Sequence, residues 1–310
     1  MRVVFLGTPD FAVPSLQLLI KSHHEILAVV TQPDKAVGRK QEITFSPVKK
    51  LALENGLKVL QYNKIRLEGV EELKSLNADI MISCAYGQIL SQEIIDICPH
   101  GIINVHGSLL PKYRGAAPIQ YAVLNGDKET GVTIMQTEIG IDTGDMLSVR
   151  KTPIGKNETA GELFDRLSVI GAELLIETLD KIEKGTITPI KQDDTKATHV
   201  KMIKKEDGVI DWTKDCTQVF NHIRGMNPWP CAFTGLKGKV LKIMSAKPVQ
   251  TDKAAAPGCV ISADLNDGLV VACGQGALQI LQLQLEGGKR LMARDFLLGR
   301  KINVGDLLKW

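Results

Sequence analysis

Short apolar runs alternate with amphipathic segments through the first half of the chain. The runs read VVFLG, ILAVVTQ, ADIMISCA and IINVH, and the segments that follow them read PSLQLLIKS, SPVKKLALENG, SQEIIDI and APIQYAVLNG. Continuous apolar strands separated by amphipathic helices are typical of a parallel sheet that is covered on both faces. Ser46 and Pro47 suit the N-cap and first position of one such helix. The pattern predicts a Rossmann-like, mostly parallel sheet domain over residues 1–189.

A longer helical pattern closes this domain. Leucine and isoleucine recur every three or four residues between positions 159 and 184, with Thr159 and Glu162 placed as a capping box and Gly185 after the last turn. The polar stretch TITPIKQDDTKATHVKMIKKED then lacks apolar periodicity. We therefore expect one long helix whose apolar stripe packs on the sheet, followed by a linker over residues 190–206.

The last third of the chain changes to short strands. After a helix near residues 214–224, runs such as KVLKIMSA, GLVVACG and ALQILQLQL are separated by Gly and Asn-Asp-Gly turns. This spacing predicts a small OB-like β-barrel over residues 207–310, a fold that often holds nucleic acid.

The formal net charge of +3 is unevenly spread along the sequence. Residues 196–310 carry 17 basic and 10 acidic side chains, a net of +7, whereas the 21 basic and 25 acidic side chains of residues 1–195 give −4. The C-terminal part is thus the better candidate for binding a polyanion. Ordinary scatter of surface charge is the alternative.

Other composition features exclude several classes of protein. The six cysteines form no C-x-x-C pair, and no two histidines have the usual spacing of metal ligands, so neither a disulfide framework nor a metal cofactor is expected. The chain opens on a strand rather than a signal peptide, and no apolar run reaches the roughly 20 residues that span a bilayer. These features predict a cytoplasmic protein. After the first strand Pro9 and Ala12 break the G-x-G-x-x-G pattern of dinucleotide-binding folds, which argues against an NAD site.

The clearest chemical signal lies in IINVHGSLLPKYRGAAP and, further on, in EIGIDTGD. Asn104 and His106 leave a buried strand at its end, where open α/β sheets keep their active sites. An amide and a protonated imidazole can donate hydrogen bonds to the oxyanion that forms when an amine attacks a carbonyl. Asp142 can orient the imidazole and help remove the proton of the amine. The structural alternative is a histidine of the core and an asparagine that serves the turn.

The combined motif resembles the signature of enzymes that transfer formyl from 10-formyltetrahydrofolate. It reads Asn104-x-His106-x-Ser108-Leu109-Leu110-Pro111-x-Tyr113-Arg114-Gly115, followed by Asp142-x-Gly144. The opening MRVVFLGTPDFAVPSL, the stretch TQPDKAVGR followed by SPVKKLA, the turn NPWP and the overall length extend the resemblance, over essentially the whole chain, to the methionyl-tRNA formyltransferase family.

The resemblance implies a role for individual residues. Asn104, His106 and Asp142 would be catalytic, and the folate cosubstrate would contact the segment made of Ser108, Leu109, Leu110 and Pro111. Initiator methionyl-tRNA would be the acceptor, and its formylation serves translation initiation; neither a metal nor an obligate protein partner is implied.

A loop of the first domain is the expected tRNA contact. Arg39 and Lys40 follow Gly38, but Gln41 and Glu42 come next, so the positive charge is thinner than family members often show. A solvated surface loop is the alternative. Tyr113, Arg114 and Trp229 stay open between shaping the structure and touching a substrate.

The same polar residues could also support other functions. A formyltransferase that acts on an amino sugar nucleotide, or a hydrolase that releases formate, would need the same three polar residues but no basic C-terminal domain. An RNA-binding protein without catalysis would have no physical need for the three residues at the end of a strand.

Overall fold

The computed structural model describes residues 1–37, 42–299 and 302–309 and divides the chain into two compact units. The first unit comprises Met1–Pro118, Glu129–Pro153 and Phe164–Val200, and the second comprises Ile119–Lys128, Ile154–Leu163 and Lys201–Trp310. Both units therefore draw on stretches that are separated in the sequence.

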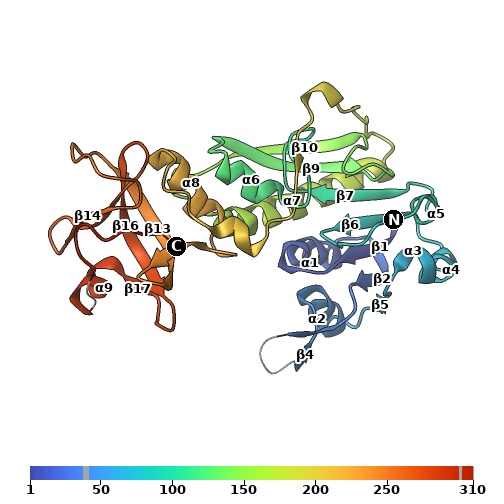
Figure 1. Ribbon diagram of the computed structural model, residues 1–310. Helices are drawn as coiled ribbons and strands as arrows, with labels where there is room; N and C mark the ends of the chain where they lie inside the picture. The colour runs from blue at the N-terminus through green and yellow to red at the C-terminus, as the bar shows by residue number, and fades with distance from the viewer. Residues whose placement is uncertain (38–41, 300–301, 310) are drawn as a thin grey trace. The chain divides into compact units, whose positions relative to one another are not determined.

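A seven-stranded sheet forms the centre of the first unit, in the order β10-β9-β7-β6-β1-β2-β5 (Figure 1). Its first five strands along the chain, apart from the small hairpin below, run parallel, whereas β9 and β10 are antiparallel to their neighbours. The expected mostly parallel sheet is confirmed. The strands are β1 (Arg2–Gly7), β2 (Glu25–Thr31), β5 (Val59–Gln61), β6 (Ile80–Cys84), β7 (Ile102–His106), β9 (Glu129–Gln136) and β10 (Met146–Pro153).

Helices cover both faces of this sheet. Ile102 and Met81 belong to a buried cluster with residues of α3, α4 and α5, whereas Gly171 of α7 lies against Val105 and Val132 on the opposite face. A Cβ at Gly171 would lie only 2.9 Å from Val105 Cγ1, so the close approach of helix and sheet needs glycine. The helices are α1 (Val13–Lys21), α2 (Pro47–Glu54), α3 (Ile65–Glu68), α4 (Val70–Ser75), α5 (Gln92–Ile95) and α7 (Ala160–Glu183).

The predicted helix ends are confirmed by their caps. Ser46 Oγ accepts a hydrogen bond from Lys49 N at the start of α2. At the start of α7, Thr159 N donates to Glu162 Oε2 and Glu162 N donates to Thr159 Oγ1, which is the reciprocal pair of a capping box. Gly185 follows the helix with φ = +63°, a left-handed conformation that glycine adopts without strain.

Shorter elements complete the first unit. A 3-10 turn, η1 (Asp10–Ala12), precedes α1, and another, η2 (Asp194–Lys196), follows the main sheet in the chain. Two small ladders are β3 (Lys35–Val37) with β4 (Glu42–Thr44), and β8 (Arg114–Gly115) with β11 (His199–Val200). The segment predicted as a linker thus contributes β11 to the first unit; the predicted boundaries at residues 189 and 207 remain predictions.

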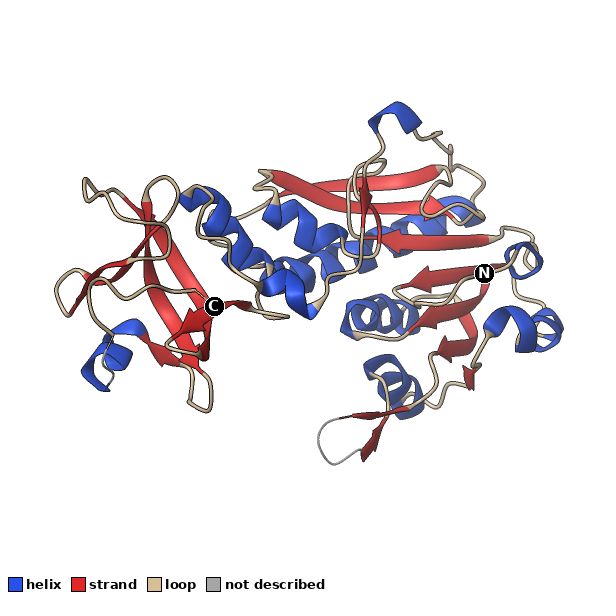
Figure 2. Ribbon diagram, in the orientation of Figure 1, coloured by secondary structure: helices blue, strands red, loops and turns tan. Residues whose placement is uncertain are grey.

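The second unit contains a sheet of its own, drawn in red in Figure 2. It is antiparallel, with the order β12-β13-β16-β15-β14 and β17 paired to β16. Its strands are β12 (Ala232–Leu236), β13 (Lys239–Val249), β14 (Val260–Asp264), β15 (Gly268–Ala272), β16 (Ala277–Leu285) and β17 (Leu291–Met292). Within the described part of the chain no pairing joins β14 to β12, so no closed barrel is found and the OB-like label is not confirmed.

Three helices and a 3-10 turn accompany this sheet: α6 (Pro118–Leu124), η3 (Lys205–Gly208), α8 (Cys216–Gly225) and α9 (Ala293–Gly299). Asp215 caps α8 by accepting from Thr217 N and Gln218 N, close to the predicted start. Among the described helices of either unit, none combines the length and apolar character needed to cross a membrane.

Candidate active site

Asn104 and His106 lie on the same face of β7. Residues two apart on a strand point to one side, so these two side chains share the face of Ile102, opposite the face that Val105 presents to α7. His106 is the last residue of the strand and is buried, whereas Asn104 is partly exposed. The strand thus places an amide and an imidazole side by side at the carboxyl edge of the parallel strands.

The imidazole of His106 contacts both ends of the motif. Its Nε2 lies 3.0 Å from the carbonyl oxygen of Tyr113, and its Nδ1 lies 3.6 Å from Asp142 Oδ2. A carbonyl oxygen can only accept a hydrogen bond, so Nε2 carries a proton in this arrangement. The structure therefore brings His106 and Asp142 together as the sequence predicts, and it adds an unpredicted contact at the second ring nitrogen.

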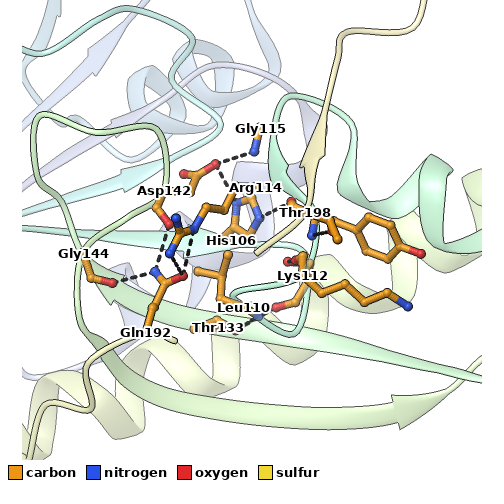
Figure 3. Close-up of polar contacts among 12 residues, drawn as sticks. His106, Leu110, Lys112, Arg114, Gly115, Thr133, Asp142, Gly144, Gln192 and Thr198 are labelled. Atoms are coloured by element: carbon orange, nitrogen blue, oxygen red, sulfur yellow. Dashed lines mark hydrogen bonds and ion pairs between the residues drawn. The ribbon is translucent and has the colours of Figure 1, made fainter. Parts of the chain in front are cut away.

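Asp142 is held at both its side chain and its backbone. Gly115 N donates to Asp142 Oδ2 at 2.7 Å, and Gln192 Nε2 donates to the carbonyl oxygen of Asp142 at 2.8 Å (Figure 3). Asp142 has φ = +53°, a left-handed conformation that is uncommon outside glycine. At Gly144, which the motif predicts, a Cβ would lie 1.9 Å from the carbonyl oxygen of Gln136. The turn that presents the carboxylate is thus fixed by close packing and by hydrogen bonds.

Gln192 connects this turn to Arg114. Its Nε2 also donates to the Gly144 carbonyl at 2.7 Å, and its Oε1 accepts from Arg114 Nε and Nη2 at 3.0 and 2.8 Å (Figure 3). Arg114 is buried and extends a further bond of 2.7 Å to Asp194 Oδ1. Buried polar groups of this kind are stable only when fully paired. Arg114 therefore shapes the site from inside rather than from the surface.

Thr198 and the strand β11 that follows it hold the same loop from the other side of the chain. Tyr113 N donates to Thr198 Oγ1 at 2.8 Å, and Arg114 N donates to the Thr198 carbonyl at 2.8 Å. At Gly115, where φ is +114°, a Cβ would lie 2.2 Å from the carbonyl oxygen of Val200. The loop that carries the Tyr113 carbonyl and the Gly115 amide is consequently anchored by residues that follow α7 in the chain.

The predicted folate segment forms a tight loop directly after His106. Ser108 is fully buried; its hydroxyl donates to the carbonyl of Lys112 at 2.6 Å, and its own carbonyl accepts from Thr133 Oγ1 at 2.7 Å. Leu110 N donates to the same Thr133 hydroxyl at 3.2 Å. Ser108 is thus engaged within the loop, and Leu109 and Pro111 are its more accessible members.

A cavity of about 450 Å³ opens at the same edge of the sheet. It is lined by residues that follow β1, β2 and β6, among them Thr8, Gln32 and Tyr86. Burial alone would raise the pKa of Asp34 in its wall, but hydrogen bonds from Lys49 and Gln61 outweigh burial and hold that pKa below its usual value. The wall therefore carries a paired carboxylate rather than a free charge.

The structure bears differently on the expected tRNA contacts and on Trp229. Arg39 and Lys40, the expected tRNA contacts, lie outside the described residues. Trp229 is exposed in the second unit, within the NPWP turn.

Sequence reasoning missed Gln192, Thr198 and Thr133. Polar residues in a polar run give no periodic signal, so Gln192 and Thr198 were read as part of a linker. The motif left Arg114 open between shaping the structure and touching a substrate, so it did not point to Gln192 as its buried acceptor.

Comparison with known proteins places this geometry in a family. A formyl transferase model matches residues 1–179, and a model of the formyl transferase C-terminal domain matches residues 202–301. The methionyl-tRNA formyltransferase of Citrifermentans bemidjiense is 51% identical over 310 residues, which cover 99% of this chain and 96% of that protein. The chain belongs to the methionyl-tRNA formyltransferase family.

Other members and more distant structures agree with this assignment. The family member from Caldanaerobacter subterraneus subsp. tengcongensis is 48% identical and aligns over 100% of both chains. Among solved structures, an N-formyltransferase of Helicobacter canadensis, crystallised with folinic acid and dTDP-3-aminofucose, matches with a TM-score of 0.69 at 22% identity, over 93% of this chain and 99% of that one. HypX of Aquifex aeolicus, crystallised with tetrahydrofolic acid, matches with a TM-score of 0.66 at 17% identity; this chain spans 50% of its length. These two structures share the fold.

Proposed function

We propose that Asn104, His106 and Asp142 carry out the reaction of the family in this chain. The enzyme transfers the formyl group of 10-formyltetrahydrofolate to the α-amino group of methionyl initiator tRNA, which gives formylmethionyl-tRNA for translation initiation. The observation that carries the assignment of the residues is the 3.6 Å approach of His106 Nδ1 to Asp142 Oδ2, because it joins two halves of the motif that are distant in the sequence.

The transfer is an addition followed by an elimination. The amine nitrogen attacks the formyl carbon, the carbonyl oxygen becomes an oxyanion, and the carbon–nitrogen bond to the folate breaks as the carbonyl re-forms. Hydrogen bonds from the Asn104 amide and the His106 ring stabilise the oxyanion. The attacking nitrogen loses a proton, which Asp142 helps to remove, and the folate nitrogen gains one. No side chain acts as a nucleophile.

His106 needs a change of partner to take part. Its Nε2 proton is directed at the Tyr113 carbonyl, so it reaches the oxyanion only if the substrate replaces that carbonyl or shares the proton. Asp142 stays beside Nδ1 throughout and fixes the ring. Asn104 has no such competitor, since none of the described residues bonds its amide, and it is available to the formyl oxygen from the start.

The loop after β7 is the proposed folate contact, through Ser108, Leu109, Leu110 and Pro111. The bonds of Ser108 and Thr133 hold this loop next to His106, which favours a role in placing the formyl group close to the catalytic side chains.

The second unit is proposed to bind the tRNA. Residues 196–310, which form most of this unit, carry a net charge of +7, and contacts from Lys and Arg to phosphates give affinity that is largely independent of sequence. Arg39 and Lys40 are proposed as further tRNA contacts. We also propose an OB-like fold for the second unit, a cytoplasmic location, and action without an obligate protein partner.

The activity is tested by incubating the full chain with 10-formyltetrahydrofolate and methionylated initiator tRNA, and by measuring formylmethionine after hydrolysis of the ester. A dTDP-amino sugar replaces the tRNA in a parallel reaction. Formyl transfer to the sugar alone would refute the proposed acceptor, and release of formate without transfer would point to a hydrolase.

A further inference from the structure

A second cluster of histidines and carboxylates lies at the opposite edge of the first unit's sheet. His23 and His24 come directly before β2, at its amino end, whereas His106 closes β7 at its carboxyl end. Asp180 and Glu183 project from the last turn of α7. The cluster therefore belongs to the first unit but is separate from the site of transfer.

The four side chains converge on one point. Their ligand atoms all lie within 4.8 Å of one another. Individual separations are 2.7 Å from His23 Nε2 to Glu183 Oε2, 3.6 Å from His24 Nε2 to Asp180 Oδ1, and 4.0 Å from His23 Nε2 to Asp180 Oδ1. Ligands at about 2.0–2.1 Å from a tetrahedral zinc ion lie roughly 3.3 Å apart. Two of these separations are larger than that value, and the 2.7 Å pair is a hydrogen bond between His23 and Glu183, which the ion would replace.

Two atoms of the cluster lack hydrogen-bond partners. The side chain of His24 is 0% exposed, yet neither its Nε2 nor Asp180 Oδ1 makes a hydrogen bond, although the two face each other at 3.6 Å. A buried polar atom without a partner is costly, and each case calls for an explanation. A cation between these two atoms supplies one.

We propose that His23, His24, Asp180 and Glu183 bind one zinc ion. Two imidazoles and two carboxylates are a ligand set that zinc accepts in tetrahedral geometry. The ion would join the end of α7 to the start of β2 and stabilise the first unit without taking part in formyl transfer. His23 is 61% exposed on its side chain, so an ion can enter from solvent.

The amino group of Met1 forms part of the surroundings. It donates to Glu183 Oε1 at 2.7 Å and lies 3.2 Å from His24 Nδ1, whereas Glu183 Oε2 faces His23 Nε2 at 2.7 Å. An ammonium group can only donate, so Nδ1 accepts and the proton of the neutral ring lies on Nε2. Zinc needs Nε2 without that proton, so on binding the ring proton moves to Nδ1 and the Met1 ammonium gives up that nitrogen while it keeps Glu183 Oε1.

Cobalt(II) is a spectroscopic probe for this site. The full chain is freed of metal with a chelator, titrated with Co²⁺ at pH 7.5, and followed by visible absorption and calorimetry. We expect one Co²⁺ per chain, a tetrahedral absorption band that Zn²⁺ abolishes, and no charge-transfer band from thiolate despite the six cysteines. Saturating Zn²⁺ should also raise the melting temperature, because it binds the folded chain.

Variants test the assignment of the ligands. His23→Gln and His24→Gln should each weaken Co²⁺ binding at least about tenfold, and His100→Gln, at an exposed histidine outside the cluster, should leave it unchanged. His23 is exposed, so His23→Gln should fold, and it still tests metal binding by the cluster if His24→Gln fails to fold. The proposal is wrong if Co²⁺ does not saturate a site, or if His23→Gln binds it as tightly as the unaltered chain. Neither result depends on formyl transfer, so a failure of the metal proposal would leave the proposed function untouched.

Discussion

The two edges of the first unit's sheet carry similar side chains in different arrangements. At the carboxyl edge one histidine, His106, meets one carboxylate, and both ring nitrogens have a neighbour, the Tyr113 carbonyl and Asp142. At the amino edge two histidines and two carboxylates converge, and the buried Nε2 of His24 has no hydrogen-bond partner. Histidine and aspartate alone therefore do not define a function.

The surroundings of the carboxylates explain the difference. Asp142 receives a backbone N–H on its side chain, and Gln192 fixes its carbonyl, so it can orient a ring but has little freedom to move. Asp180 lies at the end of a helix and is partly exposed. A fixed pair suits repeated proton and hydrogen-bond exchange with a substrate, whereas a convergent set of two imidazoles and two carboxylates suits an ion that stays.

The largest expected effect belongs to the carboxyl edge. His106→Ala and Asn104→Ala should each lower kcat by about 10² to 10³, because each removes a hydrogen bond to the oxyanion. Formylation of methionyl initiator tRNA gives the rate, and circular dichroism gives the fold. Near-normal turnover in a folded variant would remove that residue from the mechanism.

Gln192 tests whether the fixed position of Asp142 matters. Gln192→Glu keeps an acceptor for Arg114 but loses the donor to the Asp142 and Gly144 carbonyls, so we expect kcat to fall roughly 10- to 100-fold through misplacement of the carboxylate. The KM for the folate should change little. Steady-state kinetics with both substrates separates the two parameters.

Gln192→Ala is the matched variant. It also removes the acceptor of the buried Arg114, so it should lose about 1–3 kcal/mol of unfolding free energy in addition to activity. Full kcat in Gln192→Glu would show that Asp142 keeps its position without the amide of Gln192.

The sequence predicted those parts of the site that strand and helix patterns specify. Asn104 and His106 were placed together because they alternate with apolar residues in one strand, and α7 was predicted from its periodicity and its capping box. The roles of Gln192 and Thr198 were not predicted, because their positions depend on how the chain returns to the loop after β7. The closure of the barrel was overestimated for a related reason: strand spacing does not reveal which edge strands pair.

The cluster of His23, His24, Asp180 and Glu183 could not be predicted from the sequence for another reason. His23 and His24 are adjacent and lack the usual spacing of ligands along one element, and their partners belong to the far end of α7. Only the packing of that helix beside the start of β2 brings the two pairs together.

A smaller effect is expected when the amino edge is altered. His24→Gln should leave kcat within about twofold of the unaltered enzyme, because it shares no contact with the transfer site. The same formylation assay as for His106→Ala measures it, on chelator-treated protein. A loss of kcat comparable to that of His106→Ala would mean that the two edges of the sheet act as one site.

The smallest expected effect is a change in how stability depends on pH. Burial lowers the pKa of His24 and, as the leading cause, that of His222. An unfolded histidine takes up its proton near pH 6.5, whereas the two folded rings do so only at lower pH. Below about pH 6.5 the unfolded chain therefore binds more protons, and the free energy of unfolding decreases as the pH is lowered. Thermal melts of metal-free protein between pH 7.5 and 5.5 should therefore show a shallower decline for His24→Gln than for His100→Gln. His222 still contributes, so the decline should not vanish. Equal slopes in the two variants would show that burial does not hold His24 neutral in the folded chain.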